Sequence, residues 1–124
     1  MPIAWEFRGP ILVVTLTGAV HNPEIERVIL GEAFSGVQAG AGIQVLWDAR
    51  GALTPLSPEE MEWRTETMSS LAQRGMVSRF ALLMRVEWQD TIALARSESM
   101  LKAMHPLQFA VFTEEEEALA WLFS

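Results

Sequence analysis

Cysteine is absent from this 124-residue sequence, as is tyrosine, and lysine occurs once beside eight arginines. Without cysteine the chain forms no disulfide, has no thiolate nucleophile and cannot bind a metal through sulfur. We also expect no secretory signal, because no basic region followed by an apolar stretch is visible at residues 1–6. The densest apolar run, residues 11–16, is far shorter than the about 20 residues that a membrane-spanning helix needs. We therefore expect a cytoplasmic protein without a transmembrane segment.

Positive charge is scarce as well. The formal net charge is −7, and the basic residues are scattered singly along the chain. Nucleic-acid partners require a basic surface that neutralises phosphates, so we expect no such partner. The one run of charge is acidic, at residues 114–117, where Thr113 and Glu116 have the spacing of a capping box. Because acidic side chains in a first turn favour the helix dipole, we interpret this run as a helix start.

The residues that are present indicate one globular domain spanning residues 1–124. Half of them are hydrophobic and a fifth are charged, and a chain of this length can bury a single core. Apolar runs predict strands at residues 3–7, 11–17, 43–47, 80–84 and 107–112. Helical patterns are expected from an Asn22 cap to about residues 36–40, and at residues 58–74, 88–104 and 114–123.

The alternation of these elements predicts an α/β fold. Two strands joined at Gly9-Pro10 form an antiparallel hairpin, and each later strand is followed by a helix. Short, uncharged strands that alternate with helices are typical of parallel strands buried by those helices. We therefore expect a mixed, mostly parallel five-stranded sheet with about four helices.

Three stretches suggest a known family. They are VVTLTG at residues 13–18, VLWDAR at residues 45–50, and FAVF at residues 109–112 followed by EALAWL at residues 117–122. Together with the order of elements, they resemble the STAS fold of sulphate-transporter tails and anti-sigma-factor antagonists. More narrowly, the chain resembles the SpoIIAA-like family, a bacterial branch grouped with CRAL-TRIO-like domains. These are packing motifs, so the resemblance implies a fold more than an activity.

Ser57 lies where that resemblance bears on function. Anti-sigma-factor antagonists carry an Asp-Ser-Ser-Gly type motif in which a partner kinase phosphorylates one serine. The comparable stretch here, residues 55–58, keeps only the serine. Ser57 followed by Pro58 and Glu60 has the pattern of a capped helix start, and the acidic residues 59–60 would repel a phosphate. We interpret Ser57 as a helix cap.

Asp48 follows the apolar run 43–47, at the end of a strand where α/β proteins place ligands and chemistry. An aspartate there also starts turns by bonding to its own following backbone, and Arg50 is close enough to pair with it. No histidine or second acid is near it in the sequence, so the turn is favoured. In the resembling family the matching aspartate borders the interaction loop, so Asp48 remains a candidate binding residue.

Patterns for catalysis, metal binding and cofactor binding are missing. His21 and His105 are too far apart for a spacing-based metal motif. The glycines at residues 36–42 lack nucleotide-binding spacing and precede a strand, and no serine lies in a Gly-x-Ser-x-Gly elbow. We therefore expect no enzymatic activity, no metal and no cofactor.

Tryptophan is unusually frequent, with five residues accompanied by seven methionines. Trp63 is two residues from Met61 and so lies off the apolar stripe of its helix, whereas Trp88 begins the next helix. Both fit ordinary exposed aromatic residues. Alternatively, with the methionines of these two helices, they border an adaptable apolar groove.

The sequence thus favours a non-catalytic regulatory domain that binds a hydrophobic, lipid-like molecule or a protein partner. The candidate binding residues are Asp48, Arg50, Ser57, Trp63 and Trp88, with Arg50 expected to hold an anionic head group. A homodimer is expected, because a small domain this rich in hydrophobic residues leaves an apolar helix face to cover. The alternative is a partner switch controlled by phosphorylation of Ser57.

Overall fold

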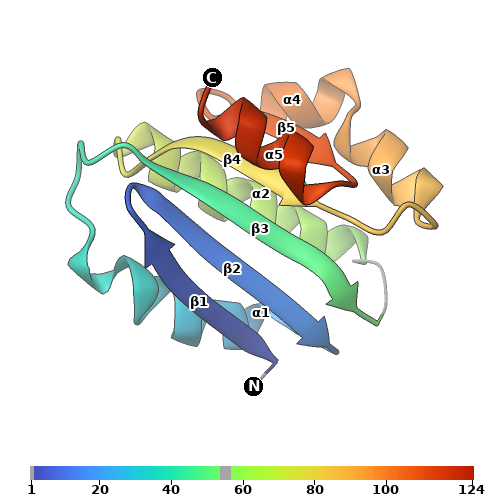
Figure 1. Ribbon diagram of the computed structural model, residues 1–124, viewed down its shortest axis with the longest axis horizontal. Coiled ribbons are helices and arrows are strands. Elements are labelled where there is room, and N and C mark those ends of the chain that lie inside the picture. The colour runs from blue at the N-terminus through green and yellow to red at the C-terminus, as the bar shows by residue number, and fades with distance from the viewer. Residues whose placement is uncertain (1, 54–56) are drawn as a thin grey trace.

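The computed structural model describes residues 2–53 and 57–124, which fold around one five-stranded sheet (Figure 1). The strands are β1 (Ile3–Arg8), β2 (Ile11–Gly18), β3 (Ile43–Ala52), β4 (Val77–Leu83) and β5 (Gln108–Phe112). They lie side by side in chain order. β1 is antiparallel to β2, and all later neighbours are parallel. The mixed, mostly parallel sheet with an N-terminal hairpin is therefore confirmed.

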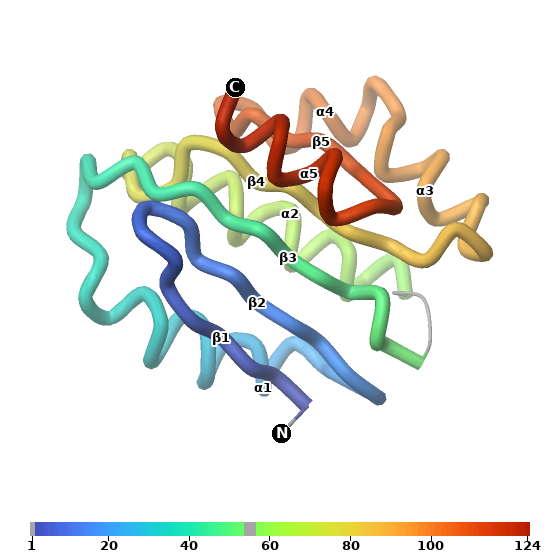
Figure 2. Tube along the Cα trace, viewed as in Figure 1, coloured from blue at the N-terminus to red at the C-terminus, as the bar shows by residue number. Residues whose placement is uncertain are grey.

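The helices cover the two faces of the sheet unequally. They are α1 (Asn22–Ile25) with its continuations η1 (Glu26–Leu30) and η2 (Ala33–Gly36), α2 (Pro58–Gln73), α3 (Gln89–Ala95), α4 (Glu98–Met104) and α5 (Glu115–Leu122). Figures 1 and 2 show α5 in front of the sheet and α1 and α2 behind it. Right-handed crossovers between neighbouring parallel strands put every connecting helix on the same face. α5 connects to no later strand and packs on the other face.

The core follows the alternation of side chains along the strands. Leu12, Val14 and Leu16 point to the face covered by α1 and α2, whereas Ile11 and Val13 point to the opposite face. These β2 side chains are almost fully buried. On the first face, aromatic rings form a row across three strands: Trp47 is stacked 5.7 Å from Phe80, which lies 5.9 Å from Phe109.

The helix expected at residues 88–104 is two helices. α3 ends at Ala95 and α4 begins at Glu98. The side chain of Ser97 accepts a hydrogen bond from the backbone N–H of Met100 at 3.2 Å and so caps α4. A serine in this role has extended backbone angles, which stop the preceding helix. The prediction of a single helix was wrong because this cap lies inside an otherwise helical sequence pattern.

Two expected caps also differ. His21, not Asn22, is the N-cap of α1, and the amide of Asn22 instead donates to the backbone carbonyl of Glu60 at 3.4 Å. Glu114, not Thr113, is the N-cap of α5, and no side-chain cap bond forms at this described helix end. Three acidic residues in the first turn of α5 still favour its dipole.

Strand β3 is longer than expected, because it continues through Asp48 to Ala52. Thr15 pairs with Asp48 and Thr17 with Gly51, so two residues of β3 stand opposite one residue of β2. This is a β-bulge, and it lets the strand bend without ending. Glycine fits there because a Cβ atom on Gly51 would lie 2.7 Å from the carbonyl oxygen of Leu16.

Substitution of Gly51 by alanine should destabilise the protein. The new methyl group would also lie 2.9 Å from Cγ2 of Thr17, so β2 and β3 must separate, at a cost of about 1–3 kcal/mol for overpacking. Chemical denaturation measures this as a lower midpoint. Gly36→Ala is the control, because nothing lies within 4 Å of its Cβ position. Equal stability of the two variants would contradict the bulge contact.

A candidate ligand-binding cavity between the sheet and helix α2

A partly open cavity of about 90 Å³ lies on the helix-covered face of the sheet. Its floor is the aromatic row of Trp47, Phe80 and Phe109. α1 contributes Ile25, α2 contributes Met61 and Trp63 among other residues, and α3 and α4 supply the remaining helical wall. The cavity therefore lies where four helices converge on one face of the sheet.

Large and flexible apolar side chains dominate the cavity wall. Three of the five tryptophans line it: Trp47, Trp63 and Trp88. Five of the seven methionines line it as well: Met61, Met68, Met84, Met100 and Met104. Methionine is unbranched and polarizable, so such a wall can adapt its shape to a molecule inside it.

The sequence-predicted tryptophans meet at this cavity. Trp63 is half-buried and packs against the main core, and Trp88 is half-buried at the N-cap of α3. The guanidinium of Arg85 lies 5.6 Å from the ring centroid of Trp88. The structure thus brings together two aromatic side chains that are 25 positions apart in the sequence.

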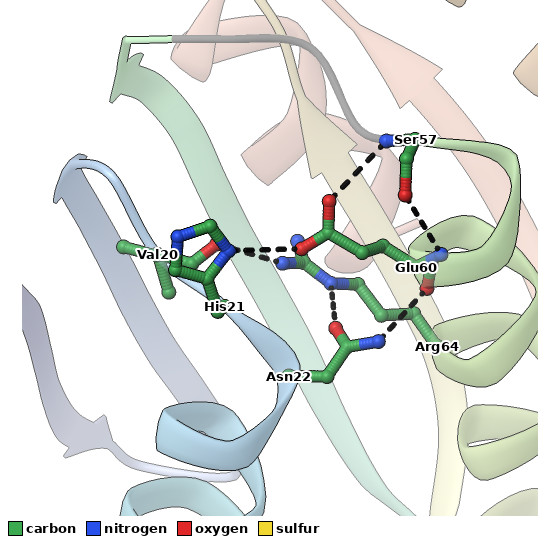
Figure 3. Close-up of polar contacts among 6 residues, drawn as sticks. All are labelled: Val20, His21, Asn22, Ser57, Glu60 and Arg64. Atoms are coloured by element: carbon green, nitrogen blue, oxygen red, sulfur yellow. Dashed lines mark hydrogen bonds and ion pairs between the residues drawn. The ribbon is translucent and has the colours of Figure 1, made fainter.

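Four polar residues line one part of the cavity: His21, Glu60, Arg64 and Thr65. Figure 3 shows how Arg64 reaches from α2 toward the segment before α1. Its Nε donates to Oδ1 of Asn22 at 2.9 Å, and its Nη2 donates to the backbone carbonyl of Val20 at 3.3 Å. Burial lowers the pKa of Arg64 to about 10, and the nearby charge of Glu60 opposes this shift. Arg64 therefore stays charged at neutral pH.

Two neighbours contact the Glu60 carboxylate at the same rim (Figure 3). Its carboxylate accepts from the backbone N–H of Ser57 at 3.3 Å and lies 3.4 Å from Nδ1 of His21. Burial alone would raise the pKa of Glu60. The hydrogen bonds from Ser57 and His21, with the charge of Arg64, lower it below its ordinary value. Glu60 is consequently a carboxylate at neutral pH.

Ser57 is the N-cap of α2, as the sequence predicts. Its side chain accepts from the backbone N–H of Glu60 at 3.2 Å, which together with the return bond from Glu60 forms a complete capping box. The stretch compared with the phosphoserine motif begins at residue 55, and residues 54–56 lie outside the described residues. Ser57 does not line the cavity itself, but it is hydrogen-bonded to Glu60, which does.

Asp48 and Arg50 pair with each other, away from the cavity. Nε and Nη2 of Arg50 donate to the carboxylate of Asp48 at 2.9 and 2.8 Å, and the backbone N–H of Arg50 donates to Oδ1 at 3.0 Å. Burial would raise the pKa of Asp48, but these bonds and the charge of Arg50 lower it overall. The predicted pair is therefore present, inside β3 rather than in a turn.

Arg50, predicted to hold an anionic head group, is not among the residues that line this cavity. Trp47 and Ala49 line the cavity, so Asp48 between them points to the opposite face of the sheet. Glu115 of α5, on that opposite face, raises the pKa of Arg50 together with Asp48. Arg64 is the arginine at the cavity instead. The spacing of Met61, Arg64, Thr65 and Met68 places them on one face of a helix, but only the tertiary structure shows that this face borders the cavity.

A second depression, of about 450 Å³, lies along the other side of α2. It is wider and shallower, and charged and polar side chains such as Glu66, Ser70 and Arg74 contribute to it. Trp63 lines both depressions. The apolar, more enclosed cavity is the better candidate for binding a small molecule.

Clustered metal ligands and membrane-spanning helices are absent from residues 2–53 and 57–124. No cluster of three or more histidine, cysteine, aspartate or glutamate side chains is placed to hold a metal ion there. No helix in that part of the chain has the length and apolar character required to span a membrane. The two histidines have different surroundings: His21 is at the cavity rim, and the carbonyl of His105 accepts from Ser69.

The fold is similar to that of a solved protein. An uncharacterized protein of the DUF3478 family from Shewanella loihica PV-4, which has a SpoIIAA-like fold, superimposes with a TM-score of 0.61. The match covers 97% of this chain and 91% of that one, at 22% sequence identity. No protein-family model matches the sequence, and no curated protein does. The comparison confirms the SpoIIAA-like fold.

Loss of the Ser57 hydroxyl should weaken α2. Ser57→Ala removes the acceptor for the Glu60 N–H and should lower the free energy of unfolding by about 0.5–2 kcal/mol. Ser57→Asn should restore most of the loss, because asparagine is an equally good cap. Thermal denaturation of the three proteins measures the difference. If the alanine variant is as stable as the parent, the capping bond contributes nothing.

Proposed function

We propose that this SpoIIAA-like domain is a non-catalytic, regulatory binding protein whose ligand is a small hydrophobic molecule held in the cavity beneath α2. The observation that carries the proposal is the cavity itself, lined by tryptophan and methionine side chains from the sheet, α2, α4 and the start of α3. Sites for small molecules are typically concave and apolar, with a few convergent polar groups. His21, Glu60 and Arg64 are such groups at this cavity.

The size of the cavity supports a binding role. Protein interiors are close-packed, and voids larger than a water molecule are few. A space of about 90 Å³ among core side chains is therefore an uncommon departure from close packing. Imperfect packing of this kind is most readily retained in a small domain where the space serves a function.

The size of the cavity also limits the ligand. A cavity of about 150 Å³ accommodates benzene in another protein, and the present cavity of about 90 Å³ is smaller. A short chain or a single ring is therefore the largest group that a modest movement of the methionines can admit. A longer lipid chain would need α2 to separate from α3 and α4.

Filling the cavity should abolish binding without unfolding the protein. Ala95 of α3 is buried in the cavity wall, and Ala95→Leu would place its added carbons in the empty space. We expect binding of 1-hexanol, followed by tryptophan fluorescence, to be lost while the thermal midpoint stays equal or rises. Leu94→Ala is the control, because Leu94 on the same helix is 51% exposed. Unchanged hexanol binding by Ala95→Leu would refute the cavity as the site.

A protein partner is the second candidate, and a specific surface favours a second copy of the chain. β1 is an edge strand, and its Trp5 and Phe7 side chains are 37% and 42% exposed, in edge-to-face contact at 6.1 Å. Edge strands with exposed apolar side chains are templates for pairing with another chain. A phosphorylation switch is less well supported, because the Ser57 hydroxyl already accepts the capping bond.

If β1 pairs with its copy, a charge at its aromatic surface should prevent association. We expect sedimentation at micromolar concentration to give a dimer for the parent and a monomer for Phe7→Lys. Phe123→Lys tests the same change at another exposed aromatic residue, 70% exposed at the end of α5, and should leave the dimer intact. A monomeric parent at these concentrations would end the proposal.

A further inference from the structure

Arg64 is a largely buried cation whose two hydrogen-bond acceptors are both neutral. They are the side-chain amide oxygen of Asn22 and the backbone carbonyl of Val20. Across residues 2–53 and 57–124, no carboxylate lies within 4.0 Å of its guanidinium. Buried charges in proteins are generally paired with an opposite charge. The positive charge of Arg64 therefore lacks a contacting counter-charge.

The guanidinium of Arg64 also has more N–H donors than its hydrogen bonds to the described residues use. An arginine guanidinium carries five N–H groups. Among the described residues, acceptors are present for the N–H groups of Nε and Nη2. Arg50 shows the contrast, since its Nε and Nη2 both donate to the carboxylate of Asp48. A carboxylate satisfies an arginine through two parallel hydrogen bonds, and such charged bonds are about twice as strong as neutral ones.

Glu60, the acid nearest to Arg64 in sequence on α2, does not fill this role. Its carboxylate interacts with the Ser57 backbone and His21 (Figure 3). Its charge still reaches Arg64, because it raises the pKa that burial lowers. The same charge would repel a doubly charged phosphate more strongly than a singly charged carboxylate. The rim is therefore suited to one negative charge.

We infer that the ligand of the cavity is a monocarboxylate with a short apolar tail, whose carboxylate binds Arg64 and whose tail lies among the tryptophans and methionines. This inference rests on the proposed function, because it names the chemical class of the molecule in that cavity. Trp63 and Met61 lie within one turn of Arg64 on α2, and all three line the cavity. One helix thus presents the cation and part of the apolar wall.

The test compares two probes that differ in charge, hexanoate and 1-hexanol, by calorimetry and tryptophan fluorescence at pH 7. The parent should bind hexanoate about tenfold or more tightly than hexanol, as expected for a charged hydrogen-bonded pair. Arg64→Met replaces the charged side chain with an apolar one of similar length. This variant should lose the preference for hexanoate while still binding hexanol. Arg64→Lys keeps the positive charge but lacks the two parallel N–H donors of a guanidinium. Its preference for hexanoate should lie between those of the parent and Arg64→Met.

Arg74→Met is the matched control. Arg74 also belongs to the α2 region and carries the same charge, but it lines the other depression. This variant should keep the full preference for hexanoate. If Arg74→Met loses the preference as Arg64→Met does, the effect is one of net charge and the inference is wrong.

The outcomes separate this inference from the proposed function. Equal binding of hexanoate and hexanol by the parent overturns the carboxylate inference and leaves the hydrophobic cavity as the site. Binding of neither probe at millimolar concentration overturns both. Because the parent alone gives these results, the inference remains testable even if Arg64→Met fails to fold.

Discussion

The handedness of the connections between parallel strands is the constraint on which the rest of this structure depends. β2, β3, β4 and β5 are neighbours in chain order and run parallel, so each connection is a right-handed crossover on the same side. α1, α2 and the α3–α4 pair must then share one face of the sheet, and α5 is left to cover the other (Figure 1). Crowding three connections onto one face creates the place where a cavity can form.

Helix α2 is central to that face, and polar contacts hold it on both sides. Toward α1, Arg64 binds Asn22 and the backbone of Val20. Toward α4, the Thr65 hydroxyl, which donates to the carbonyl of Met61 at 2.8 Å, lies 3.4 Å from the sulfur of Met100, and Ser69 donates to the carbonyl of His105 at 3.0 Å. These contacts fix the position of α2 at its edges, while the space beneath its centre is lined by flexible methionines. The combination gives a cavity with a polar rim and an adaptable interior.

Local patterns explain which parts of the fold could be predicted. The strand runs, the glycine stop after α2 and the Ser57–Glu60 capping box depend on neighbours within a few residues. Errors arose where two local signals competed or where a strand was continued by its partners. Ser97 interrupts a helical pattern, and β3 continues past Trp47 because β2 accommodates it through a bulge at Gly51.

The sequence by itself determined the α/β class, the five strands, the Ser57 cap and the unusual supply of tryptophan and methionine, because each is a property of composition or of short spacing. The tertiary structure alone decided which arginine lies at the cavity. Alternation along β3 sends Arg50 to the α5 face, where it pairs with Asp48. Packing of α2 against the segment before α1 brings Arg64 to Asn22, 42 positions away. Such contacts depend on the three-dimensional arrangement of helices, which no local pattern encodes.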